Sequence, residues 1–97
     1  MNYVLEITDT AITDGIEAFL WYESLVTGLG IEFSESLESF YEKLLLNPYS
    51  HSYFDGTTRH GVLDRFPYTV VYDVFNEVIV IYSVFMEKQD PEKKRVK

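Results

Sequence analysis

The stretch Arg59-His-Gly-Val-Leu-Asp-Arg-Phe-Pro-Tyr68 decides the fold of this chain, because two segments dense in β-branched and aromatic residues follow it. These segments are Thr69–Val74 and Val78–Phe85, and a short turn around Asn76 separates them. Such residues favour strands, and two runs joined by a short turn are typical of a hairpin. We expect an antiparallel sheet with strands near Thr58–Leu63, Tyr68–Val74 and Val78–Met86.

The first half of the chain predicts a strand followed by two helices. Apolar residues alternate in Tyr3–Thr8, which indicates a strand. Asp14 with Glu17 three residues later is a capping-box pattern, and it predicts a helix over Asp14–Thr27. Helical spacing predicts a second helix over Glu32–Leu46, which Asn47-Pro48 ends. The fold class is therefore α+β, with an N-terminal strand, a two-helix hairpin and a three-stranded antiparallel meander.

The inward faces of these elements predict a core and one buried charge. The core residues are Phe33, Leu37, Phe40, Leu44, Val70, Tyr72, Ile79 and Ile81. Glu23 falls in the middle of an apolar face of the first helix. Because a buried carboxylate without a partner is costly, we expect Glu23 to pair with Arg59 or Arg65. Gly61 inside a strand indicates a bulge.

Composition limits the classes of function. The 97 residues predict one domain over residues 1–91 and a basic tail over residues 92–97. The net charge is −8, and residues 1–58 carry ten acids but only Lys43 as a base. An acidic chain repels nucleic acid at long range. The chain has no cysteine, no signal-peptide pattern and no apolar run of membrane-spanning length, so we expect a cytoplasmic protein without metal, cofactor or membrane contact.

Several short motifs together resemble the RelE/ParE superfamily, the toxins of bacterial type II toxin–antitoxin systems, also called plasmid stabilisation proteins. The motifs cover almost the whole chain and are Asp14–Glu23, Gly28–Phe33, Asn47-Pro48, Arg59 with Leu63–Tyr72, and Asp90-Pro91. The resemblance implies a compact toxin that a separately encoded antitoxin wraps and inactivates. RelE-like members cleave mRNA on the ribosome, whereas ParE-like members inhibit DNA gyrase.

The catalytic residues of a nuclease are only partly present. Carried over by position, Arg59 and Arg65 match the basic sheet positions of the family, and His60 is a candidate general base. Met86 stands where many relatives carry histidine, and Gln89 stands where arginine commonly precedes Asp-Pro. A thioether and an amide cannot replace these groups. The pattern therefore leans against an enzyme.

Each candidate also has a purely structural interpretation. Arg59 and Arg65 could form internal ion pairs in so acidic a chain. Instead of acting as a general base, His60 could be a solvent-exposed, neutral imidazole. The same interpretation applies more strongly to His51, which lies in the loop after the second helix. These alternatives leave the catalytic residues unknown, with Arg59, His60 and Arg65 as candidates.

The first helix and the tail supply candidate partner contacts. Ile16, Phe19 and Leu20 lie on one side of the helix, and Trp21 and Leu25 lie on roughly the opposite side. A helix that is apolar on two sides must be covered on two sides, by the sheet and by either the next helix or another chain, such as an antitoxin or a second copy. The resemblance implies that the tail also contacts the target or the antitoxin, through Lys93, Lys94 and Arg95; the alternative is a solvated tail.

We therefore expect a ParE-like toxin that acts by binding a protein, with DNA gyrase as the candidate target, and that an antitoxin neutralises. The first rival is a RelE-like, ribosome-dependent mRNA endonuclease that uses Arg59, His60 and Arg65 together with the basic tail. The second rival is a degenerate, non-toxic homologue that serves only as a binding partner.

Overall fold

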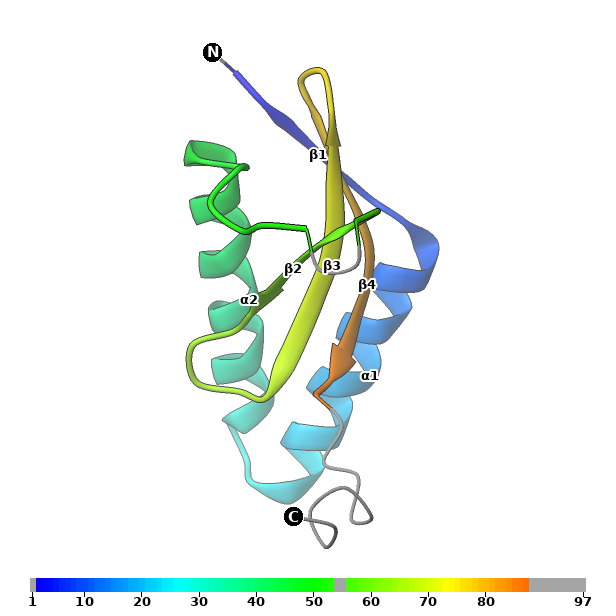
Figure 1. Ribbon diagram of the computed structural model, residues 1–97. Coiled ribbons are helices and arrows are strands. Elements are labelled where there is room, and N and C mark those ends of the chain that lie inside the picture. The colour runs from blue at the N-terminus through cyan, green and yellow to red at the C-terminus, as the bar shows by residue number, and fades with distance from the viewer. Residues whose placement is uncertain (1, 54–55, 88–97) are drawn as a thin grey trace, which may run out of the picture.

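The computed structural model describes residues 2–53 and 56–87, which form one four-stranded sheet and two helices. The elements are β1 (Val4–Ile7), α1 (Asp9–Leu25), α2 (Leu29–Leu46), β2 (Arg59–Val62), β3 (Tyr68–Phe75) and β4 (Val78–Met86). The strand order is β1-β4-β3-β2, and both helices lie on one face of the sheet (Figure 1). This confirms the predicted α+β architecture. No helix in the described ranges is both long and apolar enough to cross a membrane.

The direction of β1 differs from the prediction of an antiparallel sheet. β1 runs parallel to β4, with Val4 opposite Val78 and Ile7 opposite Ile81. The meander of β2, β3 and β4 is antiparallel, as predicted. The sheet is therefore mixed. No hairpin turn links β1 to β4, so the local sequence does not fix their relative direction.

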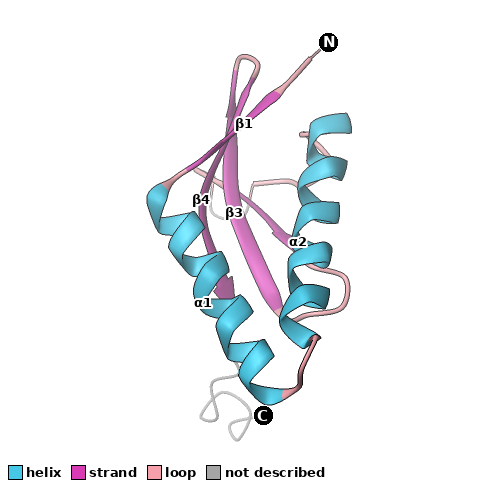
Figure 2. Ribbon diagram, turned by 180° about the vertical axis from the view of Figure 1, so that it is seen from behind, coloured by secondary structure: helices cyan, strands magenta, loops and turns pink. Residues whose placement is uncertain are grey.

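The core lies between the helical hairpin and the sheet, as seen from the helix side in Figure 2. Seven of the eight predicted core residues are buried, and Leu37 is partly buried. Aromatic rings fill one end of the core: the ring centroid of Phe33 lies 5.4 Å from that of Phe66 and 5.0 Å from that of Tyr68. α1 contributes the small side chains of Ala11 and Ala18, which allow it to lie close to the sheet.

The predicted start of α1 at Asp14 is wrong, because Thr8 caps the helix and Asp9 begins it. The Thr8 hydroxyl accepts a hydrogen bond from the Ala11 amide at 3.1 Å and donates one to the Tyr82 carbonyl at 3.0 Å. Asp14 instead lies within the helix, where its carboxylate accepts a hydrogen bond from the Val84 amide at 3.0 Å. Two polar side chains thus fasten α1 to β4.

The bulge predicted at Gly61 lies elsewhere. The pairing of β3 with β4 shifts between Val71 and Tyr72, which leaves Tyr82 as the extra residue of β4. Gly61 pairs regularly with Val70. A Cβ at Gly61 would lie 2.6 Å from the Phe40 ring, so close packing explains this glycine.

The predicted pairing of Glu23 with an arginine is also wrong. The Glu23 carboxylate accepts hydrogen bonds from the amides of Gly28 at 2.8 Å and Gly30 at 2.9 Å. Amides in the first turn of a helix lack intrahelical partners and favour a negative charge. The start of α2 therefore supplies the partner that the prediction assigned to Arg59 or Arg65.

Candidate functional site

The sheet face opposite the helices is acidic in the part of the chain that the structure describes. Side chains alternate between the faces of a strand, so Asp73 points away from the core to which Tyr72 belongs. Glu6 of β1 lies opposite Val80 and belongs to the same open face. Of residues 2–53 and 56–87, no lysine or arginine lies on this face. It offers a phosphate group no fixed cation there.

Arg59 points to the helix side of the sheet. It lies opposite Tyr72, whose side chain is in the core. Its Nη1 donates a hydrogen bond to the His51 carbonyl at 2.6 Å. Its guanidinium carbon lies 4.2 Å from the ring centroid of Tyr53 and 5.0 Å from that of Tyr49, as in cation–π contacts. Arg59 thus anchors the segment between α2 and β2.

The other two candidates lie elsewhere. Arg65 follows β2, and its Nη2 lies 2.6 Å from Glu32 Oε1 in an exposed ion pair. His60 alternates with Arg59 and so faces the open side, where its Nε2 lies 3.3 Å from the Thr58 hydroxyl. The structure does not gather the three residues into one cluster. Within residues 2–53 and 56–87, no group of three His, Asp or Glu side chains is placed to hold a metal ion.

Among the described residues, the charged side chains beside the end of β4 are acidic. Met86, the last residue of the strand, is exposed, and a hollow of about 250 Å³ beside it is lined by Asp14 and Glu17. Two carboxylates near this position would repel a phosphate. Gln89 and the predicted tail contacts Lys93, Lys94 and Arg95 lie outside the described residues.

α1 presents exposed apolar side chains on two sides, although the sequence predicted that the sheet covers one of them. Trp21 is 52% exposed and Leu25 is 53% exposed. On another side, Ile12, Ile16 and Leu20 are exposed at a spacing of four residues; we call these three residues the α1 ridge. Contiguous exposed apolar side chains of this kind mark interaction surfaces.

A groove of about 310 Å³ between α1 and α2 adjoins the α1 ridge. Ile12, Ile16, Phe19, Leu37 and Tyr41 line it together with the carboxylate residue Glu38. Burial, and then the charge of Asp14, raises the pKa of Tyr41 to about 12, so its phenol stays neutral. The groove is therefore an apolar slot with an acidic residue in its lining, which suits the apolar face of a partner segment.

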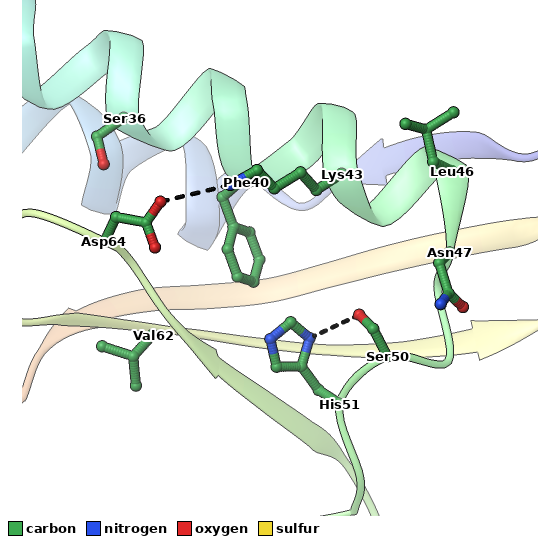
Figure 3. Close-up of a pocket in the computed structure, with 9 residues that line it drawn as sticks. All are labelled: Ser36, Phe40, Lys43, Leu46, Asn47, Ser50, His51, Val62 and Asp64. Atoms are coloured by element: carbon green, nitrogen blue, oxygen red, sulfur yellow. Dashed lines mark hydrogen bonds and ion pairs between the residues drawn. The ribbon is translucent and has the colours of Figure 1, made fainter.

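Sequence reasoning gave no role to a cluster around His51. His51 Nδ1 lies 3.2 Å from the Tyr72 hydroxyl and 3.3 Å from the Ser50 hydroxyl. The His51 ring also packs against Phe40, with ring centroids 5.4 Å apart. Figure 3 shows His51, Ser50 and Phe40 beside a cavity between α2 and β2. The only sequence signal for this cluster was Asn47-Pro48, which ends α2 and lets the following segment return toward β2.

No protein-family model matches the chain, and no curated protein matches its sequence. Solved structures match its fold. A chain of the chromosomal ParDE toxin–antitoxin system from P. aeruginosa superposes with a TM-score of 0.76 at 17% identity, over 91% of this chain and 98% of that one. The isolated RelE toxin from E. coli gives 0.63 at 17% identity, over 97% and 94%. A chain of the RelBE2 toxin–antitoxin complex from Mycobacterium tuberculosis gives 0.54 at 16% identity, over 89% and 99%.

Proposed function

We propose that this chain, which has the RelE/ParE toxin fold, is the toxin of a type II toxin–antitoxin system and acts in the cytoplasm by binding a protein, as ParE-like toxins do. The observation that carries the proposal is the open face of the sheet. Among the described residues, Glu6 and Asp73 place negative charge on this face. RNA cleavage needs cations for the charge that builds on the phosphate, and this face supplies none from those residues.

The surface of the helices supports a protein partner. The α1 ridge and its adjoining groove offer apolar contact, and Trp21 and Leu25 offer a second apolar surface. Two of the matched structures come from systems or complexes with an antitoxin, which favours an antitoxin as one partner. The resemblance to ParE makes DNA gyrase the candidate target.

Induction of the full chain in a bacterium tests the proposal. We expect growth to stop, plasmid supercoiling to fall, and protein synthesis to continue during the first loss of supercoiling. Early arrest of translation with unchanged supercoiling would instead support the mRNA endonuclease. Unimpaired growth would support the degenerate homologue that serves only as a binding partner.

Variants on the exposed apolar surface separate a binding role from a structural one. Trp21→Glu and Leu25→Glu place a charge at positions that are already exposed, so the fold should survive. We expect one or both to abolish growth arrest or neutralisation by the antitoxin. Leu46→Glu is the matched control, because Leu46 is 86% exposed at the far end of α2. If all three variants change growth arrest or neutralisation equally, Trp21 and Leu25 do not form a specific binding surface.

Codon-dependent cleavage of mRNA in a translating extract tests the nuclease rival directly. A ribosome can supply part of an active site. A lack of cleavage of free RNA would therefore not exclude cleavage of mRNA on the ribosome. We expect no cleavage above the level of an Arg59→Ala, Arg65→Ala double variant. Because Arg59 anchors a loop, circular dichroism must first show that this variant is folded. Cleavage by the wild type that a folded double variant lacks would overturn the proposal.

A further inference from the structure

A cavity of about 330 Å³ lies between the C-terminal half of α2 and β2, away from the open sheet face and from the α1 ridge. Phe40, His51 and Val62 form apolar and aromatic walls, and Lys43 and Asp64 also line it (Figure 3). The volume is sufficient for a ring system of one or two rings.

The hydrogen bonds around His51 favour one position for the proton of the neutral ring. The Tyr72 hydroxyl donates its only proton to the Pro48 carbonyl at 3.1 Å. This leaves the hydroxyl oxygen to accept from His51 Nδ1, which lies 3.2 Å away, and favours the tautomer with the hydrogen on Nδ1. His51 Nε2 then has a free lone pair. Burial lowers the pKa of His51, which keeps the ring neutral near pH 7.

The imidazole ring of His51 forms part of the cavity wall. In Figure 3 the Nδ1 side of the ring faces Ser50, and the other nitrogen lies on the side of Val62. Among the described residues no hydrogen-bond donor meets Nε2. A Cβ at position 61 would lie 2.9 Å from Nε2, so the glycine allows the His51 ring to pack closely against β2. An acceptor held rigidly in an apolar pocket selects for a donor.

We infer that this cavity binds a small planar heteroaromatic molecule whose ring N–H donates a hydrogen bond to His51 Nε2. The ring would lie against Phe40 and Val62. Lys43 Nζ and Asp64 Oδ2, 3.4 Å apart, link α2 to the segment after β2 beside the cavity. This bridge leaves less room for a polypeptide backbone, which favours a free molecule over a side chain of a partner protein.

Indole and benzofuran form a matched pair of probes, because they share shape and size but only indole has an N–H donor. Each is titrated into the full-length, ¹⁵N-labelled protein while the histidine side-chain ¹⁵N spectrum is recorded. The chain has two histidines, and a His60→Gln variant assigns their signals. We expect an unprotonated His51 Nε2 in the free protein, a saturable shift with indole, and binding of benzofuran weaker by about fivefold or more.

Two variants locate the effect. His51→Phe keeps an aromatic ring but removes the acceptor, so the preference for indole should disappear. Glu42→Gln changes an exposed side chain of α2 that does not line the cavity, so the preference should remain. The comparison of the two probes on the wild type decides the matter even if a variant does not fold.

Three results would overturn the inference. They are equal binding of indole and benzofuran to the wild type, a protonated Nε2 in the free protein, or no shift of His51 at saturating indole. Binding of N-acetyl-tryptophanamide as tight as that of indole would overturn the preference for a free molecule. It would identify a tryptophan of a partner protein as the occupant.

Discussion

Gly30, near the start of α2, donates its backbone N–H to the Glu23 carboxylate of α1 at 2.9 Å. Gly28 donates to the second oxygen of the same carboxylate at 2.8 Å. α2 has no capping side chain of its own, since its N-cap is Gly28 with a φ of 91°. One side chain of α1 therefore caps α2 and fixes the angle of the helical hairpin.

Replacement of Glu23 by glutamine should lower the free energy of unfolding by about 1–3 kcal/mol. The neutral amide offers only one acceptor, and its NH2 group would face a backbone donor. Urea unfolding measures the change. Glu42→Gln is the control, because Glu42 is exposed on the same hairpin and its loss should stay within about 0.5 kcal/mol. Equal stability of the two variants would contradict the capping role.

Two helical glycines should respond to alanine in opposite directions. At Gly15 a Cβ would meet only Leu37 Cδ2 at 3.5 Å, an ordinary contact, so Gly15→Ala should raise the free energy of unfolding by roughly 0.5–1 kcal/mol. At Gly30 a Cβ would lie 2.6 Å from the Phe19 carbonyl oxygen and 2.9 Å from Glu23 Oε1. Gly30→Ala should therefore lower it by about 1–3 kcal/mol. Thermal unfolding of both variants checks the signs, and stabilisation by Gly30→Ala would refute the close packing.

The parts of the fold that local sequence specifies were predicted correctly. The hairpin of β3 and β4 follows from strand-forming runs around a turn at Asn76, whose φ of 56° suits a tight turn. The start of α1 could not be found in this way. Thr8 caps the helix while it bonds to Tyr82, 74 residues away, and Asp14 bonds to Val84, 70 residues away. Such partners are known only once the sheet is assembled.

The candidate site was predicted less well, because the direction of an arginine on a strand depends on the register. Arg59 was correctly placed on the sheet, but the rings of Tyr49 and Tyr53 hold it on the helix side. Both tyrosines come from the segment between α2 and β2, which has no periodicity from which its path can be read. For the same reason the sequence did not place His51 next to Phe40 and Tyr72.

Arg59 and Arg65 should differ in their contribution to stability. Arg59→Ala removes the hydrogen bond to the His51 carbonyl and two cation–π contacts, and should cost about 1–3 kcal/mol. Arg65→Ala removes an ion pair whose side chains are 59% and 49% exposed, and should cost no more than about 1 kcal/mol. Urea unfolding of the two single variants measures the difference. A larger loss for Arg65→Ala would mean that Arg59 does not anchor its loop.

Burial of His51 should make the protein less stable as the pH falls below neutrality. Burial lowers the pKa of the folded-state ring below the ordinary value of 6.5. Between the two pKa values the unfolded chain binds a proton that the folded chain does not, so stability is complete above about pH 6.5 and is lost as the pH falls through the folded-state pKa. The groups that face the ring are the hydroxyls of Tyr72 and Ser50, with the charges of Arg59, Lys43 and Asp64 nearby.

Urea unfolding from about pH 7.5 to about pH 5 tests this dependence, because exposed carboxylates titrate mainly below that range. The free energy of unfolding of the wild type should decrease with falling pH in this window. His51→Gln keeps a polar side chain but cannot take up a proton, so its decrease should be smaller than that of the wild type. The difference between the two slopes reports His51 alone. If the variant and the wild type lose stability in parallel, the buried imidazole is not the group that senses pH.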